Sequence, residues 1–89
     1  MSLMEKSRKP IKAEWSFRVL DMNRRLIAFQ DESRGDITSW LWDFDDGTTS
    51  IEQHPIHSYK KPGSFIVTLN VEGPAGKAKR IKVYDVAVR

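Results

Sequence analysis

The stretch that decides the fold is Trp40-Leu41-Trp42-Asp43-Phe44-Asp45-Asp46-Gly47. It places an aromatic side chain at every second position and then ends in two acids and a glycine. Alternate residues of a β-strand point to the same face of its sheet, so we expect the three aromatic rings to share one buried face. The final Asp-Gly pair tolerates the positive backbone angle φ that tight turns require. The stretch therefore predicts a half-buried strand that ends in a tight turn.

Similar strand patterns recur along the rest of the chain. The expected strands are residues 13–19, 25–31, 37–44, 48–52, 56–59, 64–72 and 77–88. Clusters of Asp, Asn, Gly and Pro separate these segments, and no run of a dozen residues shows helical periodicity. We therefore predict an all-β fold, an immunoglobulin-like antiparallel β-sandwich of about seven strands.

The core of this sandwich has to be dense, because a domain of this size buries only about 60–65% of the surface of its unfolded chain. The inward positions of the expected strands supply apolar side chains for it. The predicted core consists of Ile27, Phe29, Trp42, Phe44, Phe65, Val67, Leu69 and Val71. The chain contains no cysteine, so no disulfide stands beside Trp42 and packing alone has to hold it.

Three further aromatic residues, Trp15, Trp40 and Tyr84, belong either to this core or to an exposed binding surface. In the last strand the alternation changes phase, because Ile81 and Val83 share one parity and Tyr84 has the other. One extra residue in a β-bulge near Val83–Tyr84 would restore the facing. We therefore predict a bulge there and expect Tyr84 to be the most exposed of the three.

Charge and composition limit the kinds of partner. The formal net charge of +3 is modest and typical of a soluble surface. No stretch of about 18 apolar residues occurs, and the lack of cysteine excludes disulfides and thiolate metal sites. Lys77, Lys79, Arg80 and Lys82 alternate between two faces of the last strand, which suits protection of a sheet edge better than one basic surface. We expect no nucleic-acid partner and no membrane insertion.

The first residues of the chain differ in character from the rest. Residues 1–12 are polar, basic and without periodicity. We expect residues 1–12 to be a tag remnant and flexible linker, and residues 13–89 to form the domain.

The central motifs resemble those of the polycystic-kidney-disease (PKD) domain family. The chain reads Trp42-Asp43-Phe44-Asp45-Asp46-Gly47, then Pro55-Ile56-His57-Ser58-Tyr59, then Pro62-Gly63-Ser64-Phe65 followed by alternating apolar residues. The motif residues, which we expect to be structural, are Trp42, Asp43, Phe44, Asp46, Gly47, Pro55, His57, Tyr59, Pro62 and Gly63. The chain departs from the family at Asp45, where glycine is usual, and at Phe65, where tyrosine is frequent.

The resemblance implies a non-catalytic extracellular or cell-surface module with the immunoglobulin-like fold. Such modules contact proteins or carbohydrates, or space the domains of a larger surface or secreted protein. The alternative is an accessory carbohydrate-binding domain of a secreted polysaccharide- or protein-degrading enzyme. The implied partners are neighbouring domains of a parent protein and a polysaccharide or another surface protein; the isolated domain is expected to be a monomer.

The acids of the central stretch allow two interpretations. Asp43 and Asp46 accept backbone N–H bonds and fix the turn, or the cluster, with Asp45 as the extra acid, holds Ca²⁺, which needs six to eight oxygen ligands. His54 and His57 lie three residues apart, which on a strand places them on opposite faces and is wrong for one shared ion. The resemblance makes His57 a structural hydrogen-bonding residue.

Catalysis is not expected, and neither is a cofactor. A serine hydrolase needs a nucleophile, a base and an oxyanion hole in one place, and no nucleophile motif surrounds Ser50 or Ser58. A small sandwich also has little room for a deep substrate pocket.

Overall fold

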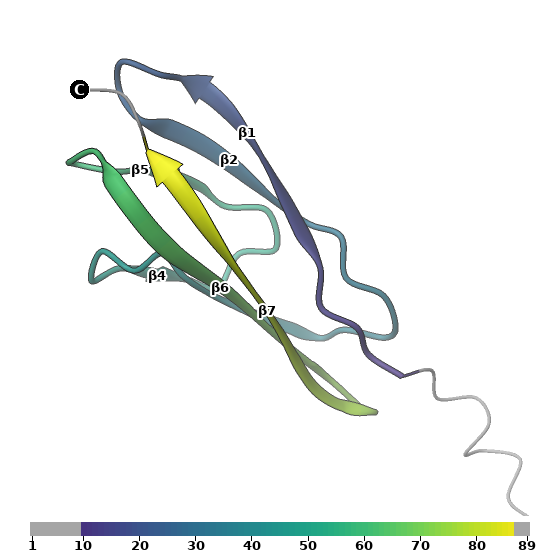
Figure 1. Cartoon of the computed structure of the whole chain (residues 1–89). Coiled ribbons are helices and arrows are strands. Elements are labelled where there is room, and N and C mark those ends of the chain that lie inside the picture. Colours follow the sequence, from purple (N-terminus) through teal and green to yellow (C-terminus); the bar gives the residue numbers. More distant parts are fainter. Residues whose placement is uncertain (1–9, 87–89) are drawn as a thin grey trace, which may run out of the picture.

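The computed structural model describes residues 10–86, which form two antiparallel β-sheets packed face to face (Figure 1). The strands are β1 (Trp15–Asp21), β2 (Leu26–Asp31), β3 (Ser39–Asp43), β4 (Thr49–Ser50), β5 (Ile56–Ser58), β6 (Gly63–Gly73) and β7 (Gly76–Val86). One sheet has the order β1-β2-β5 and the other has the order β4-β3-β6-β7. The predicted all-β sandwich of about seven strands is confirmed. No helix in the described part of the chain is long and apolar enough to cross a membrane.

Aromatic rings from both sheets fill the space between them. Trp15 of β1 and Phe29 of β2 lie against Trp42 of β3, with ring centroids 5.6 and 5.5 Å from it. The predicted core is buried at every position except Phe65, which is half-buried and stacks on Tyr59. The structure adds Ala13, Trp15, Tyr59, Tyr84 and Val86 to the buried cluster.

Two predictions for the last strand are wrong. The β6–β7 ladder runs without a register shift from Gly63 opposite Val86 to Gly73 opposite Gly76, so there is no bulge near Val83–Tyr84. Tyr84 points inward and is only 9% exposed. The change of phase has another cause: Ile81 and Val83 are apolar residues on the outer face of the sheet. The register shift in the structure lies in β1, between Val19 and Asp21.

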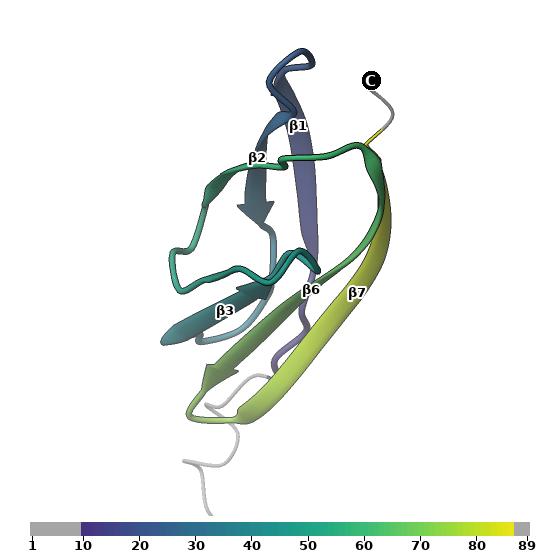
Figure 2. The same ribbon diagram turned by 90° about the vertical axis from the view of Figure 1, so that its left-hand side faces the viewer.

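The described chain begins and finishes at opposite ends of β6. A Cβ atom built on Gly73 would lie 3.2 Å from Ile11 and only 1.9 Å from the carbonyl oxygen of Asp36, so this close approach requires glycine. At the other end of the strand, Val86 pairs with Gly63. The purple and yellow ends of the ribbon accordingly lie far apart in both views (Figure 1, Figure 2).

The expected linker is only partly covered by the structure. Residues 1–9 and 87–89 lie outside the described residues. Lys12 forms an antiparallel bridge with Arg34, and Ile11 packs against the core, so residues at the end of the expected linker contact the domain.

Candidate functional site

The turn between β3 and β4 is built by two carboxylates. Asp43 accepts a hydrogen bond from the backbone N–H of Asp45 at 3.0 Å, and Asp46 accepts one from that of Thr48 at 3.1 Å. Gly47 has a φ of 87°, which glycine adopts at no steric cost. Asp43 and Asp46 therefore each accept a backbone hydrogen bond within this turn.

Asp45, the departure from the family pattern, has a positive φ of 65°. This left-handed conformation is uncommon for residues other than glycine, although Asp and Asn tolerate it best. The Asp45 carboxylate accepts a hydrogen bond of 2.9 Å from the backbone N–H of Ile66. Because β3 ends at Asp43, this side chain satisfies a β6 amide that the strand no longer reaches. The bond offsets the conformational cost of Asp at this position.

Four motif residues connect the two sheets, and we call Phe44, Asp46, His57 and Tyr59 the motif bridge. His57 Nε2 lies 2.7 Å from the Asp46 carboxylate, and the His57 ring stacks on Phe44 at a centroid distance of 4.1 Å. The Tyr59 hydroxyl donates a buried hydrogen bond of 3.1 Å to the carbonyl oxygen of Phe44. His57 and Tyr59 belong to β5 and the residue after it, whereas Phe44 and Asp46 follow β3. The bridge therefore ties the three-stranded sheet to the four-stranded sheet.

The electrostatics of the motif bridge follow from its partial burial. The side chains of His57 and Asp46 are 14% and 19% exposed. Burial acts to raise the pKa of Asp46, but hydrogen bonds from Thr48 and His57 outweigh it and hold that pKa below its ordinary value. Burial raises the pKa of Tyr59, so its hydroxyl stays protonated and remains a donor. The bridge is suited to holding structure.

The remaining motif residues lie around the bridge. Trp42 is in the core, and Pro55 is buried with its carbonyl oxygen accepting a hydrogen bond of 2.9 Å from Phe29. Pro62 and Gly63 line a hollow of about 520 Å³ beside Asp46 and His57.

The two histidines have separate partners. His54 Nδ1 accepts a hydrogen bond from the backbone N–H of Asp31, whereas His57 binds Asp46. Within residues 10–86, no three Asp, Glu or His side chains gather closely enough to hold an ion. The carboxylates of Asp43 and Asp45 are occupied by the backbone amides described above.

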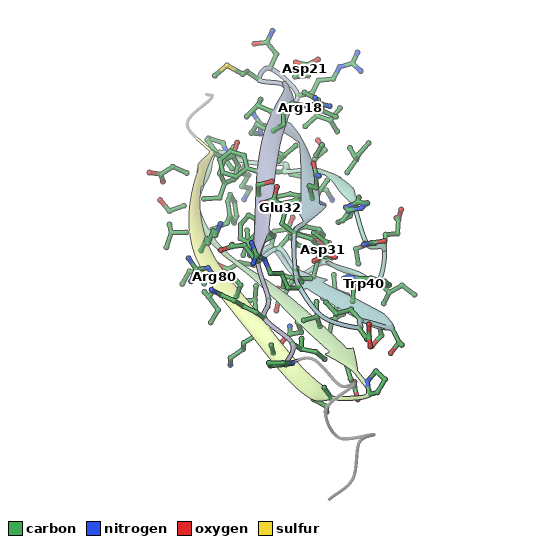
Figure 3. All side chains as sticks on the ribbon, turned by 90° about the vertical axis from the view of Figure 1, so that its right-hand side faces the viewer. Arg18, Asp21, Asp31, Glu32, Trp40 and Arg80 are labelled. Atoms are coloured by element: carbon green, nitrogen blue, oxygen red, sulfur yellow. The ribbon has the colours of Figure 1, made fainter. Side chains whose placement is uncertain are left out.

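A second connection between the sheets runs along β1 and β7, and we call Glu14, Trp15, Arg80 and Lys82 the β1–β7 seam. The Trp15 indole N–H donates to the carbonyl oxygen of Arg80 at 3.0 Å, and Lys82 Nζ donates to that of Trp15 at 2.5 Å. Glu14 forms ion pairs with Lys82 at 2.8 Å and with Arg80 at 3.5 Å. The hydrogen bond from Lys82, and then that from Trp15, lowers the pKa of Glu14. Figure 3 shows Arg80 on β7 beside β1.

Sequence reasoning assigned Arg80 and Lys82 only to edge protection and missed the seam. Their partner Glu14 lies more than sixty residues earlier in the chain, and no local pattern links them. The available signal was the alternation of the four basic residues between two faces of the strand. It separates Arg80 and Lys82, which contact the β1 side, from Lys77 and Lys79, which lie on the other face.

The aromatic side chains leave little exposed ring surface. Trp15 is 1% exposed, and the indole N–H of the half-buried Trp40 donates to the Asp31 carboxylate at 2.9 Å (Figure 3). Burial acts to raise the pKa of Asp31, but hydrogen bonds from neighbours including Trp40 hold it below its ordinary value. Phe17 is 44% exposed and packs against Tyr84. The described residues therefore present no strip of aromatic rings.

The outer face of the four-stranded sheet carries aliphatic side chains. Leu41, Ile66, Ile81 and Val83 are all exposed, and Ile66 lies directly opposite Val83. Toward the β6–β7 hairpin lies a hollow of about 540 Å³, whose lining combines apolar residues such as Trp40 and Leu41 with polar ones such as Asn70. The solvent face of an antiparallel sheet is usually polar, so this aliphatic surface is the unusual one.

These features define a class: a disulfide-free, immunoglobulin-like β-sandwich module whose motif residues join its two sheets. The sequence model of the PKD domain matches residues 23–88. The chain therefore belongs to the PKD domain family, as the resemblance indicated. This family is non-catalytic.

The curated relatives are much longer than this chain. A stretch of 46 residues is 48% identical to part of collagenase ColQ1 from Bacillus cereus (strain Q1), covering 52% of this chain and 5% of that protein. A stretch of 45 residues is 51% identical to part of the pre-pro-metalloprotease PrtV from Vibrio cholerae serotype O1 (strain M66-2), covering 51% of this chain and 5% of that protein. The matched stretches thus cover about half of this chain and about 5% of the length of these relatives.

Solved structures agree with this assignment. The PKD1 domain of Vibrio cholerae PrtV matches with a TM-score of 0.73 at 32% identity, covering 82% of this chain and 91% of that domain. The PKD1 domain of Vibrio anguillarum Epp gives a TM-score of 0.80 at 22% identity over 92% of this chain and 99% of that domain. A structure of promiscuous carbohydrate-binding modules of the β-sandwich superfamily gives a TM-score of 0.75 at 24% identity, covering 88% of this chain and 34% of that chain. The last two likenesses concern the fold alone.

Proposed function

We propose that this chain is a non-catalytic module of a larger extracellular protein-degrading enzyme, in which it separates neighbouring domains. The observation that carries the proposal is the match to segments that form about 5% of a collagenase and a metalloprotease. A segment of that share is accessory to the rest of the protein. The extracellular location and the parent activity are carried over from these relatives.

The placement of the chain ends supports a spacing role. The described chain enters beside Gly73 and leaves at Val86, opposite Gly63. These positions lie at the two ends of the eleven-residue β6, which corresponds to about 35 Å at the usual rise of a β-strand. A domain that is entered at one end and left at the other holds its neighbours apart.

Contact with a protein is a second candidate function. The exposed aliphatic side chains on the outer face of the four-stranded sheet favour it, because clustered apolar surface marks interaction sites. The carbohydrate-binding alternative has less support, since sandwich modules of that kind stack sugars on exposed rings. Trp15 and Tyr84, which were candidates for such rings, are buried.

The spacing role is tested by placing the chain between two rigid reporter domains. Small-angle scattering should give a separation of the reporters that exceeds that of a directly joined pair by about 35 Å, the length of β6. Reporters lying side by side would contradict the spacing role.

An NMR titration of the labelled chain with soluble polysaccharides and gelatin separates the other candidates. Saturating shifts with a polysaccharide would restore the carbohydrate-binding alternative, whereas shifts with gelatin on the outer sheet face would favour protein contact.

A further inference from the structure

Within residues 10–86, strand β7 is an eleven-residue strand at the edge of its sheet and pairs with β6 alone. The ladder geometry shows which of its backbone groups are unpaired. The N–H of Ile66 points toward the β3 side, where Asp45 accepts its hydrogen bond. In an antiparallel pair, the residue opposite then points its own N–H and C=O away from the shared ladder. That residue is Val83, and by alternation Lys79, Ile81 and Asp85 also direct their backbone groups to the open edge.

The side chains of these four residues form a self-complementary row on the outer face. The row reads Lys79, Ile81, Val83, Asp85, with a cation at one end and an anion at the other. Its two central members are 50% and 67% exposed. If the row is laid antiparallel against itself about Lys82, Lys79 meets Asp85 and Ile81 meets Val83. Opposite charges and aliphatic pairs are the favourable cross-strand neighbours in a sheet.

We propose that β7 pairs edge to edge with β7 of a second copy of this chain, antiparallel and centred on Lys82. The occupant is a second copy because the row is complementary to itself, as a two-fold interface requires. The free backbone groups of Lys79, Ile81, Val83 and Asp85 complete a ladder between the copies, and the two sheets become one continuous sheet. This pairing goes beyond the spacing role and does not depend on it, and it departs from the monomer expected from the sequence.

One like-charge contact opposes the pairing. The side chain of Lys82 faces the inner side of the edge, where it meets Lys82 of the second copy across the axis. Inward-pointing charges at an edge discourage strand addition. In this structure, however, the Lys82 ammonium lies 2.8 Å from the Glu14 carboxylate and also binds the carbonyl oxygen of Trp15. Its charge is compensated within each copy, so we expect weak association that depends on concentration.

Sedimentation equilibrium with charge-swapped variants tests this geometry. At low salt and up to about 1 mM, the wild-type chain should rise from its mass of 10.3 kDa toward twice that value. Lys79→Glu places two acids together across the axis, and Asp85→Lys places two lysines together, so each variant alone should associate at least about tenfold more weakly. An equimolar mixture of the two variants restores both opposite-charge pairs and should associate about as strongly as the wild type.

Control variants connect the result to β7. Val83→Asp should abolish association, whereas Ile56→Asp, at an exposed aliphatic residue on the other sheet, should leave it unchanged. Circular dichroism checks that each variant is folded. Four outcomes would overturn the proposal. The wild-type chain could stay monomeric, or the two charge-swapped variants could each associate as strongly as wild type. The mixture of the two variants could fail to associate, or association could be lost only in Ile56→Asp. A monomer whose β7 amides shift only with another protein would assign the edge to that partner instead.

Discussion

The motif bridge and the β1–β7 seam both join the two sheets, but they use different physical interactions. In the motif bridge, Tyr59 donates a buried hydrogen bond and His57 lies between Phe44 and Asp46. The seam combines ion pairs of Glu14 with the partly exposed Lys82 and Arg80 and hydrogen bonds to the carbonyl oxygens of Trp15 and Arg80. Removing one partner of a buried hydrogen bond leaves the other group unsatisfied, which costs the full desolvation penalty of that group. Exposed ion pairs contribute little to stability. Of these two connections, the motif bridge should therefore contribute the larger stabilisation.

Removing the Tyr59 ring should have the largest effect. Tyr59 is fully buried and contacts His57, Phe65 and Tyr84. Tyr59→Ala should lower the free energy of unfolding by about 3–5 kcal/mol through lost contacts and the cavity left behind. Urea denaturation measures the loss, with the exposed Ile56→Ala as a control expected to change it by less than about 0.5 kcal/mol. Equal losses for both variants would contradict the assignment of Tyr59 to the core.

Removing only the Tyr59 hydroxyl isolates the hydrogen bond. Tyr59→Phe keeps the ring but leaves the carbonyl oxygen of Phe44 without this donor. We expect a loss of about 1–2 kcal/mol in the free energy of unfolding. Phe65 gives the matched control, because its ring stacks on Tyr59 and carries no hydroxyl. Phe65→Tyr adds a hydroxyl beside position 59. The double variant Tyr59→Phe/Phe65→Tyr should not recover the free energy of unfolding that Tyr59→Phe loses. Recovery there would mean that the hydroxyl acts through solvation and not through Phe44.

The Asp46 carboxylate should make the motif bridge sensitive to acid. Its pKa is held below the ordinary value of 3.8, so its contribution to stability is present above about pH 4 and is lost as the pH falls through the lowered pKa. Asp46→Asn should cost about 1 kcal/mol at neutral pH, and the difference from wild type should shrink toward about pH 2.5. Thermal melts across this range measure it. Asp36→Asn, at an exposed carboxylate, is the control, and its melting temperature should change with pH as that of wild type does. A stability difference between Asp46→Asn and wild type that stays constant with pH would contradict this assignment.

The seam should show the smallest effect. Lys82→Met keeps much of the side-chain length but removes the ammonium that binds Glu14 and the carbonyl oxygen of Trp15. We expect a loss of less than about 1 kcal/mol in low salt, because this group is partly exposed. Urea denaturation of the variant measures it. A loss above that of Tyr59→Phe would reverse the order of the two connections.

The two connections also differ in how far sequence alone could find them. The motif bridge is predictable because its turn is local: Asp43, Asp46 and Gly47 follow a strand with a clear period of two, and the family pattern marks His57 and Tyr59. The seam is not, because Glu14 and Lys82 meet only after both sheets have formed. The same limit explains the wrong prediction for Tyr84, whose burial depends on the opposite sheet.

The apolar side chains of β7 show another limit of periodicity. Periodicity alone groups Ile81 and Val83 with the inward residues, so that a bulge is required to reconcile them with Tyr84. Periodicity detects apolar positions but does not report whether their face is covered. The uninterrupted β6–β7 ladder shows that both residues belong to the outer face.

The most direct test of the comparison is urea denaturation of wild type, Tyr59→Phe and Lys82→Met in low salt and in about 1 M salt, where exposed charges are screened beyond about 3 Å. The deficit of Tyr59→Phe should be the larger and should not change with salt, whereas that of Lys82→Met should become smaller at high salt. A Tyr59→Phe variant as stable as wild type, or a Lys82→Met deficit that exceeds that of Tyr59→Phe at both salt concentrations, would contradict the conclusion that the motif bridge stabilises the contact between the sheets more than the seam does.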